Sequence, residues 1–96
     1  MKAIHTTDLF MAWFSSLRDK QAMRRIQARI DRAEDGNFGD SEAVGEGVSE
    51  MRIHYGPGYR VYFTQRGTEI VILFAGGDKS TQASDIKAAL KLARQL

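Results

Sequence analysis

Cysteine is absent from this chain of 96 residues, and histidine occurs only twice, as His5 and His54. The lack of cysteine excludes disulfides and thiolate metal sites, and two histidines do not form a zinc site without carboxylate help. We therefore expect a protein that binds no metal and no cofactor. Its folding should also be indifferent to the redox state of its compartment.

Long apolar runs are missing as well. A stretch such as Ile70 to Ala75 is far shorter than the roughly 20 residues of a membrane helix, and the N-terminus has no signal-peptide core. We therefore expect a cytoplasmic protein with no membrane contact. A length of 96 residues with 43% hydrophobic content predicts one domain, spanning 1–96, with a single core.

Charge is segregated along the chain although the net charge is only +2. Arg18 to Arg32 holds six basic and two acidic residues, Glu34 to Glu50 holds six acidic and no basic ones, and Lys79 to Leu96 holds four basic and one acidic. Such stretches are commonly solvated helix faces, and the acidic segment could simply neutralise the basic one. They form an anion-binding surface only if the fold gathers the basic segments on one side.

The first third of the chain predicts two helices. Met1 to Thr6 is long enough only for an edge strand, and Thr6, Thr7 and Asp8 offer N-capping oxygens. Apolar residues then recur at helical spacing in two groups, which predicts a helical hairpin that ends at Asp35-Gly36-Asn37. The groups are Leu9, Phe10, Trp13, Phe14 and Leu17, and then Ala22, Met23, Ile26, Ile30 and Ala33.

The remainder predicts a loop, three strands and a helix. Residues 38–47 lack periodicity and read as a loop. Strands are expected near Val48 to Tyr55, Tyr59 to Gln65 and Glu69 to Ala75, joined by short glycine-bearing hairpins into an antiparallel meander. The third strand is apolar on both faces, so it should lie centrally and be covered on both sides. A last helix, capped by Ser80 or Thr81, presents Ile86, Ala89, Leu90 and Ala93 as its apolar stripe.

The predicted fold is therefore α+β: an N-terminal helical hairpin packed on a small antiparallel sheet, with a C-terminal helix. Because strand side chains alternate between faces, Arg52 and His54 share a face with Glu50. Arg60 shares a face with Tyr62. A sheet face that carries these residues, followed by the loop Gly76 to Lys79, suits a phosphate backbone.

The order of these elements and their motifs resembles the RelE/ParE superfamily of bacterial toxins, most closely the HigB-like addiction-module killer proteins. The resemblance spans nearly the whole chain. It is carried by Trp13-Phe14, Leu17-Arg18-Asp19, Ala28-Arg29-Ile30-Asp31-Arg32, Gly36-Asn37-Phe38-Gly39-Asp40, Gly47-Val48-Ser49-Glu50-Met51-Arg52-Ile53, Gly56-Pro57-Gly58-Tyr59-Arg60-Val61-Tyr62, Gly76-Gly77-Asp78-Lys79-Ser80-Thr81-Gln82 and Asp85-Ile86.

The resemblance implies a toxin neutralised by a co-expressed antitoxin, commonly a helix-turn-helix DNA-binding protein, through which operator DNA would be reached. Members of the superfamily either cleave mRNA on the ribosome or poison DNA gyrase, and the fold does not choose between them. An inactive homologue that only binds the antitoxin is a third possibility. Ribonuclease members carry basic residues on the sheet and before the last helix, which Arg52, Arg60 and Lys79 match. The tyrosine that some of them have near the start of that helix is absent here, and Asp85 stands at about that place.

Metal-free RNA cleavage needs a base for the 2′-hydroxyl, cations for the phosphorane and an acid for the 5′-oxygen. Arg52 and Arg60 are candidates to clamp the phosphate. Lys79 is a candidate to hold phosphate or protonate the leaving group, and His54 is a candidate base.

Each of these candidates also has a structural interpretation. One arginine could pair with Glu50 or Glu69, Lys79 could be a solvated loop residue, and His54 could be an exposed residue beside a turn. Among the tyrosines, Tyr62 is assigned to the RNA-binding site and Tyr55 and Tyr59 to packing. Asp78 and Asp85 are interpreted as helix-start anions, and Glu50 as a residue that orients Arg52.

Overall fold

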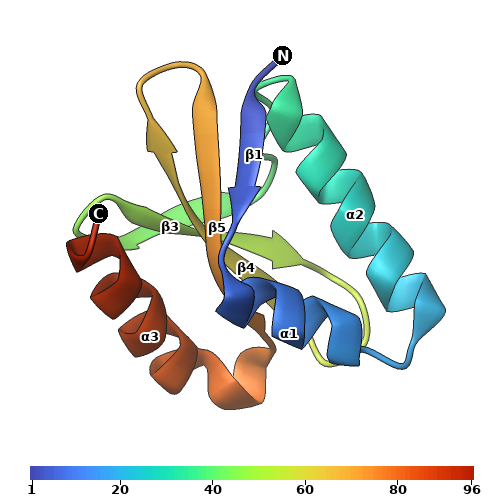
Figure 1. Ribbon diagram of the computed structural model, residues 1–96. Helices are drawn as coiled ribbons and strands as arrows, with labels where there is room; N and C mark the ends of the chain where they lie inside the picture. Colours follow the sequence, from blue (N-terminus) through green and yellow to red (C-terminus); the bar gives the residue numbers. More distant parts are fainter.

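A computed structural model describes all residues 1–96 as a five-stranded sheet with helices on both faces (Figure 1). The strand order is β1-β5-β4-β3-β2. β1 runs parallel to β5, and every other neighbouring pair is antiparallel. The elements are β1 (Ala3–Thr6), α1 (Asp8–Ser16), α2 (Lys20–Glu34), β2 (Ser41–Gly45), β3 (Val48–Ile53), β4 (Tyr59–Arg66), β5 (Ile70–Gly77), the 3-10 turn η1 (Lys79–Thr81) and α3 (Gln82–Arg94).

The predicted α+β class is confirmed, with two corrections to the sheet. The stretch 38–47, predicted to be a loop, contains the edge strand β2, and β1 makes the sheet mixed rather than purely antiparallel. β2 shows no alternation of apolar and polar residues, because it is short and exposed on an edge, where no buried face imposes a pattern. The hairpin of α1 and α2 is therefore preceded by a strand, β1. This strand lies at one edge of the sheet, which is the only position that its short sequence allowed.

Helix ends follow the capping chemistry of the sequence. The Thr7 side chain accepts the Phe10 N–H at 3.0 Å, and Asp19 caps α2 by accepting the N–H groups of Gln21 and Ala22. At the third helix, Thr81 occupies the predicted N-cap position but makes no side-chain cap bond.

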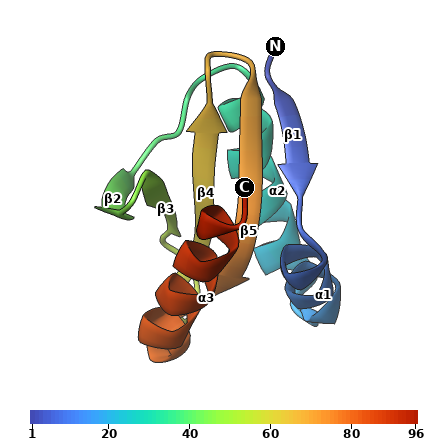
Figure 2. The same cartoon turned by 60° about the vertical axis from the view of Figure 1, so that its left-hand side comes forward.

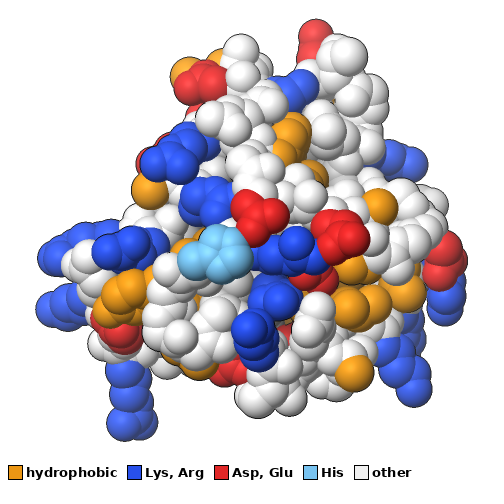
Figure 3. Space-filling model, turned by 180° about the vertical axis from the view of Figure 1, so that it is seen from behind, with side chains coloured by type: hydrophobic (Ala, Val, Ile, Leu, Met, Phe, Trp, Pro, Cys, Tyr) orange, Lys and Arg blue, Asp and Glu red, His pale blue; other side chains and the backbone are white.

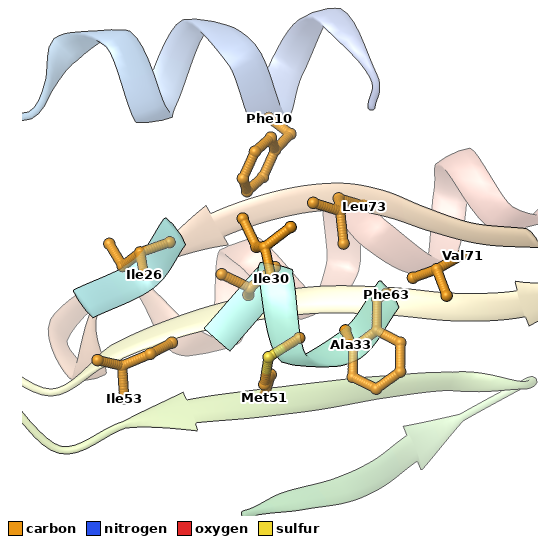
Figure 4. Close-up of a cluster of buried hydrophobic side chains, with 10 residues drawn as sticks. Phe10, Ile26, Ile30, Ala33, Met51, Ile53, Phe63, Val71 and Leu73 are labelled. Carbon is orange, nitrogen blue, oxygen red and sulfur yellow. The ribbon is translucent and has the colours of Figure 1, made fainter. Parts of the chain in front are cut away.

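α1 and α2 cover one face of the sheet. Phe10 from α1 and Ile26 and Ile30 from α2 meet side chains of β3, β4 and β5, as Figure 4 shows. Burial of apolar surface at about 25 cal/mol per Å² is what holds these layers together. The alternation of β3 and β4 places their other side chains on the opposite face. The buried cluster comprises Phe10, Ile26, Ile30, Ala33, Met51, Ile53, Val61, Phe63, Val71 and Leu73.

α3 covers the opposite face, as the two views of Figures 1 and 2 show together. Its predicted apolar stripe is confirmed: Ala89 is buried, and Ile86 and Leu90 pack beside it against a smaller cluster. β5 lies between β1 and β4 and is covered on both faces, as its apolar composition predicts. No helix is both long and apolar enough to cross a bilayer.

Candidate anion-binding site

The candidate site lies where β3 and β4 pair beneath the start of α3. In the register of this pair Arg52 stands opposite Arg60, and Glu50 stands opposite Tyr62. All four belong to the face that α3 covers, because their neighbours Met51, Ile53 and Val61 fill the core on the other side. The predicted sharing of one face by these residues is therefore seen in the structure.

Glu50 is the centre of this arrangement. It is buried, with 2% of its surface exposed, and it accepts three hydrogen bonds. Arg52 Nε lies 2.9 Å and Arg60 Nε 3.1 Å from Oε2, and Gln82 Nε2 of α3 lies 3.1 Å from Oε1. Both arginines thus pair with Glu50, and neither pairs with Glu69.

Bonding through Nε fixes the orientation of each guanidinium group and leaves its terminal nitrogens to other partners. The terminal nitrogens of Arg60 have no protein partner within hydrogen-bonding or ion-pair distance. Those of Arg52 contact two further carboxylates, Asp40 at 3.6 Å and Glu42 of β2. Hydrogen bonds to Glu50 and Glu42 raise the pKa of Arg52 above its ordinary value.

An open cavity of about 590 Å³ lies against these arginines. All four residues predicted to be catalytic line it, namely Arg52, His54, Arg60 and Lys79. Lys79 lies over the β3–β4 turn, where a Cβ added at Gly58 would meet its Cγ at 3.4 Å. Lys79 forms no ion pair in the protein.

His54 stands at the rim of the cavity with 75% of its side chain exposed, and its Nε2 lies 2.5 Å from Asp40 Oδ2. This hydrogen bond lowers the pKa of Asp40 below its ordinary value. When Nε2 carries the proton that Asp40 accepts, Nδ1 is the ring nitrogen with a free lone pair. The pair therefore has the arrangement of a histidine base oriented by a carboxylate.

The assignment of Tyr62 to an RNA-binding surface is not supported by its position. Its exposure is 0%, and its ring belongs to the apolar cluster beneath α3, so no base can stack on it. Its hydroxyl has no hydrogen-bond partner in the protein. Burial, together with the nearby charges of Glu50 and Asp85, raises the pKa of Tyr62. The alternation of side chains along β4 correctly predicted the face on which Tyr62 lies. It does not tell which element covers that face.

The other tyrosines and the acidic residues near α3 match their structural interpretations. Tyr55 and Tyr59 pack against the core cluster of α1 and α2. Asp78 caps η1 by accepting the Ser80 N–H, and Asp85 lies in the first turn of α3.

Sequence reasoning missed three participants: Asp40, Gln82 and Arg29. Asp40 lies in a segment without periodicity, and Gln82 begins a helix whose exposed face carries no pattern. Arg29 of α2 donates to the backbone carbonyls of Phe38 at 2.9 Å and of Arg52. The only available signal was the spacing of the arginines on α2, which a solvated face explains equally well.

Taken together, the site presents two fixed guanidinium groups, one free ammonium group and a carboxylate-bound imidazole around an open cavity. Figure 3 shows this face, where Lys and Arg side chains lie on both sides of a histidine and Asp and Glu side chains lie directly beside it. Guanidinium and ammonium groups bind phosphate oxygens, and imidazole moves protons near neutral pH. The arrangement can bind a phosphodiester and deprotonate a hydroxyl beside it.

Comparison with known proteins identifies a family and a relative. The family model described as "Phage derived protein Gp49-like (DUF891)" matches residues 12–96, which include every residue of the candidate site. An uncharacterized protein of Haemophilus influenzae (strain ATCC 51907 / DSM 11121 / KW20 / Rd) is 50% identical over 93 residues, which is 97% of this chain and 94% of that protein.

Proposed function

Because the chain belongs to the Gp49-like family of phage-derived proteins, a family associated with toxins of addiction modules, we propose that it is a toxin that cleaves mRNA on the ribosome. The observation that carries this proposal is the cavity lined by Arg52, His54, Arg60 and Lys79. The resemblance of the sequence to HigB-like killer proteins supports the same activity. We place the protein in the cytoplasm, where its substrate is translated.

In the proposed reaction the scissile phosphate sits against the free terminal nitrogens of Arg60. His54 Nδ1 takes the proton of the 2′-hydroxyl, whose oxygen then forms a bond to phosphorus. The guanidinium groups stabilise the charge of the phosphorane. The 5′-oxygen leaves with a proton from Lys79, so that the P–O5′ bond breaks as the P–O2′ bond forms. No metal or cofactor takes part.

Arg52 enters this scheme only after an exchange of partners. In the free protein its terminal nitrogens contact Asp40 and Glu42, whereas its Nε is held by buried Glu50. A phosphate can replace Glu42, which is 64% exposed in its side chain, without breaking the contact that orients the guanidinium group. Glu50 is therefore a positioning residue in this scheme.

The proposed partner is a cognate antitoxin, and the resemblance favours a helix-turn-helix protein. The toxin would reach operator DNA only through that complex. The antitoxin would be encoded beside the toxin, so co-expression of the neighbouring reading frame should restore growth.

The test is induction of the chain alone while mRNA 5′ ends are mapped. We expect growth arrest and new 5′ ends inside translated regions, and loss of both in Arg60→Ala. Arg60→Lys keeps the charge but removes the planar fork, and we expect it to lose most cleavage. Arg66→Ala is the matched control, because Arg66 is an exposed arginine at the far end of the same strand.

Three outcomes would contradict the proposal. An Arg60→Ala protein that folds and remains fully toxic would remove Arg60 from the site. Growth arrest with intact mRNA and loss of DNA supercoiling would instead identify a gyrase poison. Normal growth on expression of the free protein would indicate a homologue that acts only by binding the antitoxin.

A further inference from the structure

A second group of cations lies on α2, beside the candidate site but outside it. A cavity of about 280 Å³ is lined by Arg25, Arg29 and Arg32 together with Ile53 and His54. Ile53 and His54 also line the larger cavity. The two hollows therefore share Ile53 and His54 as lining residues, and each is also lined by cationic side chains.

The carboxylates of the acidic segment that follows α2 form no ion pair with the arginines of this helix. Asp40 contacts Arg52 and His54, and Glu42 contacts Arg52. No basic side chain between Arg18 and Arg32 forms an ion pair with any carboxylate of the protein. Of the α2 arginines, Arg29 is affected by the charge of Asp40, whereas Arg25 and Arg32 have no carboxylate within ion-pair distance.

The two acidic residues within the basic stretch are also engaged elsewhere. Asp19 accepts the hydroxyl of Tyr55 at 2.9 Å and caps α2, and Asp31 accepts Gln27 Nε2 at 2.9 Å. The exposed arginines of α2 therefore present uncompensated positive charge. That charge is available to an external anion.

Arg29 fixes this helix to the candidate site. Its guanidinium group donates to the backbone carbonyls of Phe38, Asp40 and Arg52. Burial, and then the charge of Arg32, lowers its pKa below the ordinary value for arginine. Gly39 permits the approach, because its φ is +60° and an added Cβ would lie 2.7 Å from Arg29 Nη2. Arg29 is structural, which leaves Arg25 and Arg32 as the arginines of this hollow that have no carboxylate partner.

Arg25 and Arg32 lie seven residues apart, which is two helical turns, or about 10 Å along the axis. They share one face of α2, since both line the same hollow. The Arg25 guanidinium carbon is held 4.8 Å from the centroid of the Tyr55 ring, and Tyr55 in turn lines the larger cavity. The spacing suits two different phosphate groups rather than one.

We infer that Arg25 and Arg32 form a binding track for the RNA backbone that continues from the candidate cleavage site across His54 onto α2. The inference rests on the proposed function, because that proposal makes RNA the substrate. An acidic protein is the less suitable ligand. The hollow offers only Ala28 and Ile53 as apolar residues, and protein interfaces are built around larger apolar anchors.

The experiment measures binding of a fluorescent 2′-O-methyl oligoribonucleotide to the full chain by anisotropy across a series of KCl concentrations. The 2′-O-methyl group prevents cleavage, so that binding is observed separately from the reaction. The test variant is Arg25→Gln with Arg32→Gln. The matched control is Lys87→Gln with Lys91→Gln, which removes the same charge from exposed, unpaired residues of α3.

We expect the arginine variant to bind more weakly for every oligonucleotide sequence. The slope of log K against log salt should fall by about 1.4, or about 0.7 for each lost phosphate contact. The lysine control should keep the wild-type slope. An unchanged slope in the arginine variant, or an equal fall in the control, would overturn the inference. So would unchanged RNA binding combined with weakened antitoxin binding, which would reassign this face to the protein partner.

Failure of the inference can be separated from failure of the proposed function. Cleavage lost in Arg60→Ala together with an unchanged salt slope in the arginine variant would keep the ribonuclease and remove the track. Binding that depends on Arg25 and Arg32 without any cleavage of mRNA would keep the track and remove the ribonuclease.

Discussion

Glu50 is the single residue that joins three elements of the candidate site. It comes from β3, and its carboxylate binds Arg52 of the same strand, Arg60 of β4 and Gln82 of α3. A buried carboxylate is costly unless it is paired and hydrogen-bonded, and here both conditions are met. The same contacts orient the guanidinium groups.

We predict that Glu50→Gln lowers the free energy of unfolding by about 3 kcal/mol, because it leaves two arginines without their shared buried counter-charge. Arg60 is the more affected, since only 11% of its side chain is exposed and Glu50 is its only ion-pair partner. Urea unfolding followed by circular dichroism measures the change. Glu42→Gln is the control, and its expected cost is below about 1 kcal/mol because the residue is exposed. Equal costs in the two variants would contradict this account.

Tyr62 carries the one buried side-chain polar atom without a hydrogen-bond partner in the protein. An unsatisfied buried hydroxyl reduces stability, so Tyr62→Phe should raise the free energy of unfolding by about 1 kcal/mol. We also expect the wild-type protein to lose stability at alkaline pH and the Tyr62→Phe variant to lose less. The raised pKa keeps the folded hydroxyl protonated, while the unfolded chain releases its proton above about pH 10.

The control for this change is Tyr55→Phe, which deletes a hydroxyl that does have a partner, the carboxylate of Asp19. It should leave stability unchanged or slightly lower. Urea unfolding at pH 7 and at about pH 11, above the unfolded pKa of tyrosine, compares the two variants. A destabilised Tyr62→Phe protein would show that the hydroxyl is satisfied.

At the scale of elements, the two glycines that end β5 allow helices to approach the sheet from both sides. A Cβ added at Gly76 would lie 2.2 Å from Trp13 of α1, and one added at Gly77 would lie 1.8 Å from Asp85 of α3. Both distances are far below van der Waals contact. The pair Gly76-Gly77 is thus explained by close packing rather than by a turn or by phosphate binding.

We predict that Gly76→Ala lowers the free energy of unfolding by about 2 kcal/mol, the usual cost of overpacking a filled site. In a double-mutant cycle with Trp13→Leu, the cost of the alanine should shrink by more than about 0.5 kcal/mol, because the smaller side chain relieves the collision. Chemical unfolding of the four proteins gives the coupling free energy. Additive effects would exclude Trp13 as the cause.

At the scale of the whole molecule, the fold sorts carboxylates by environment. Side-chain hydrogen bonds are the main reason that the pKa is lowered for four of them, Asp19, Asp40, Glu46 and Asp78. Asp85 is the exception, because burial raises its pKa. The fold therefore favours the charged form of four carboxylates and the neutral form of one.

The consequence for stability follows from proton linkage. A carboxyl whose pKa is lower in the folded than in the unfolded chain stabilises the fold above its unfolded value, about 4, and that contribution is lost as pH falls through the folded pKa. Asp85 acts in the opposite sense in the same range. We predict that Tm falls as pH is lowered from 5 to 2.5, measured by scanning calorimetry. Asp40→Asn should flatten the curve, and a Tm independent of pH would contradict the prediction.

Sequence by itself determined most of the secondary structure and the residues that share each face, because periodicity and capping are local properties of the chain. The two helices, the strands β3 to β5, the stripe of α3 and the joint face of Arg52 and Arg60 all follow from spacing. The strand β2 and the parallel pairing of β1 do not, since both depend on partners distant in the chain.

Apart from the pair of Glu50 and Arg52, which strand spacing predicts, only the tertiary structure decided which charges meet. It buried Tyr62 beneath α3, added Arg60 to the predicted pair of Glu50 and Arg52, and brought the carboxylate of Asp40 to Arg52 and His54. Strand parity places a side chain on a face but does not tell what covers that face, and the sign of a charge does not tell which of many opposite charges lies within 4 Å. Those facts depend on packing across the sheet, where contacts between residues distant in the chain determine the partners.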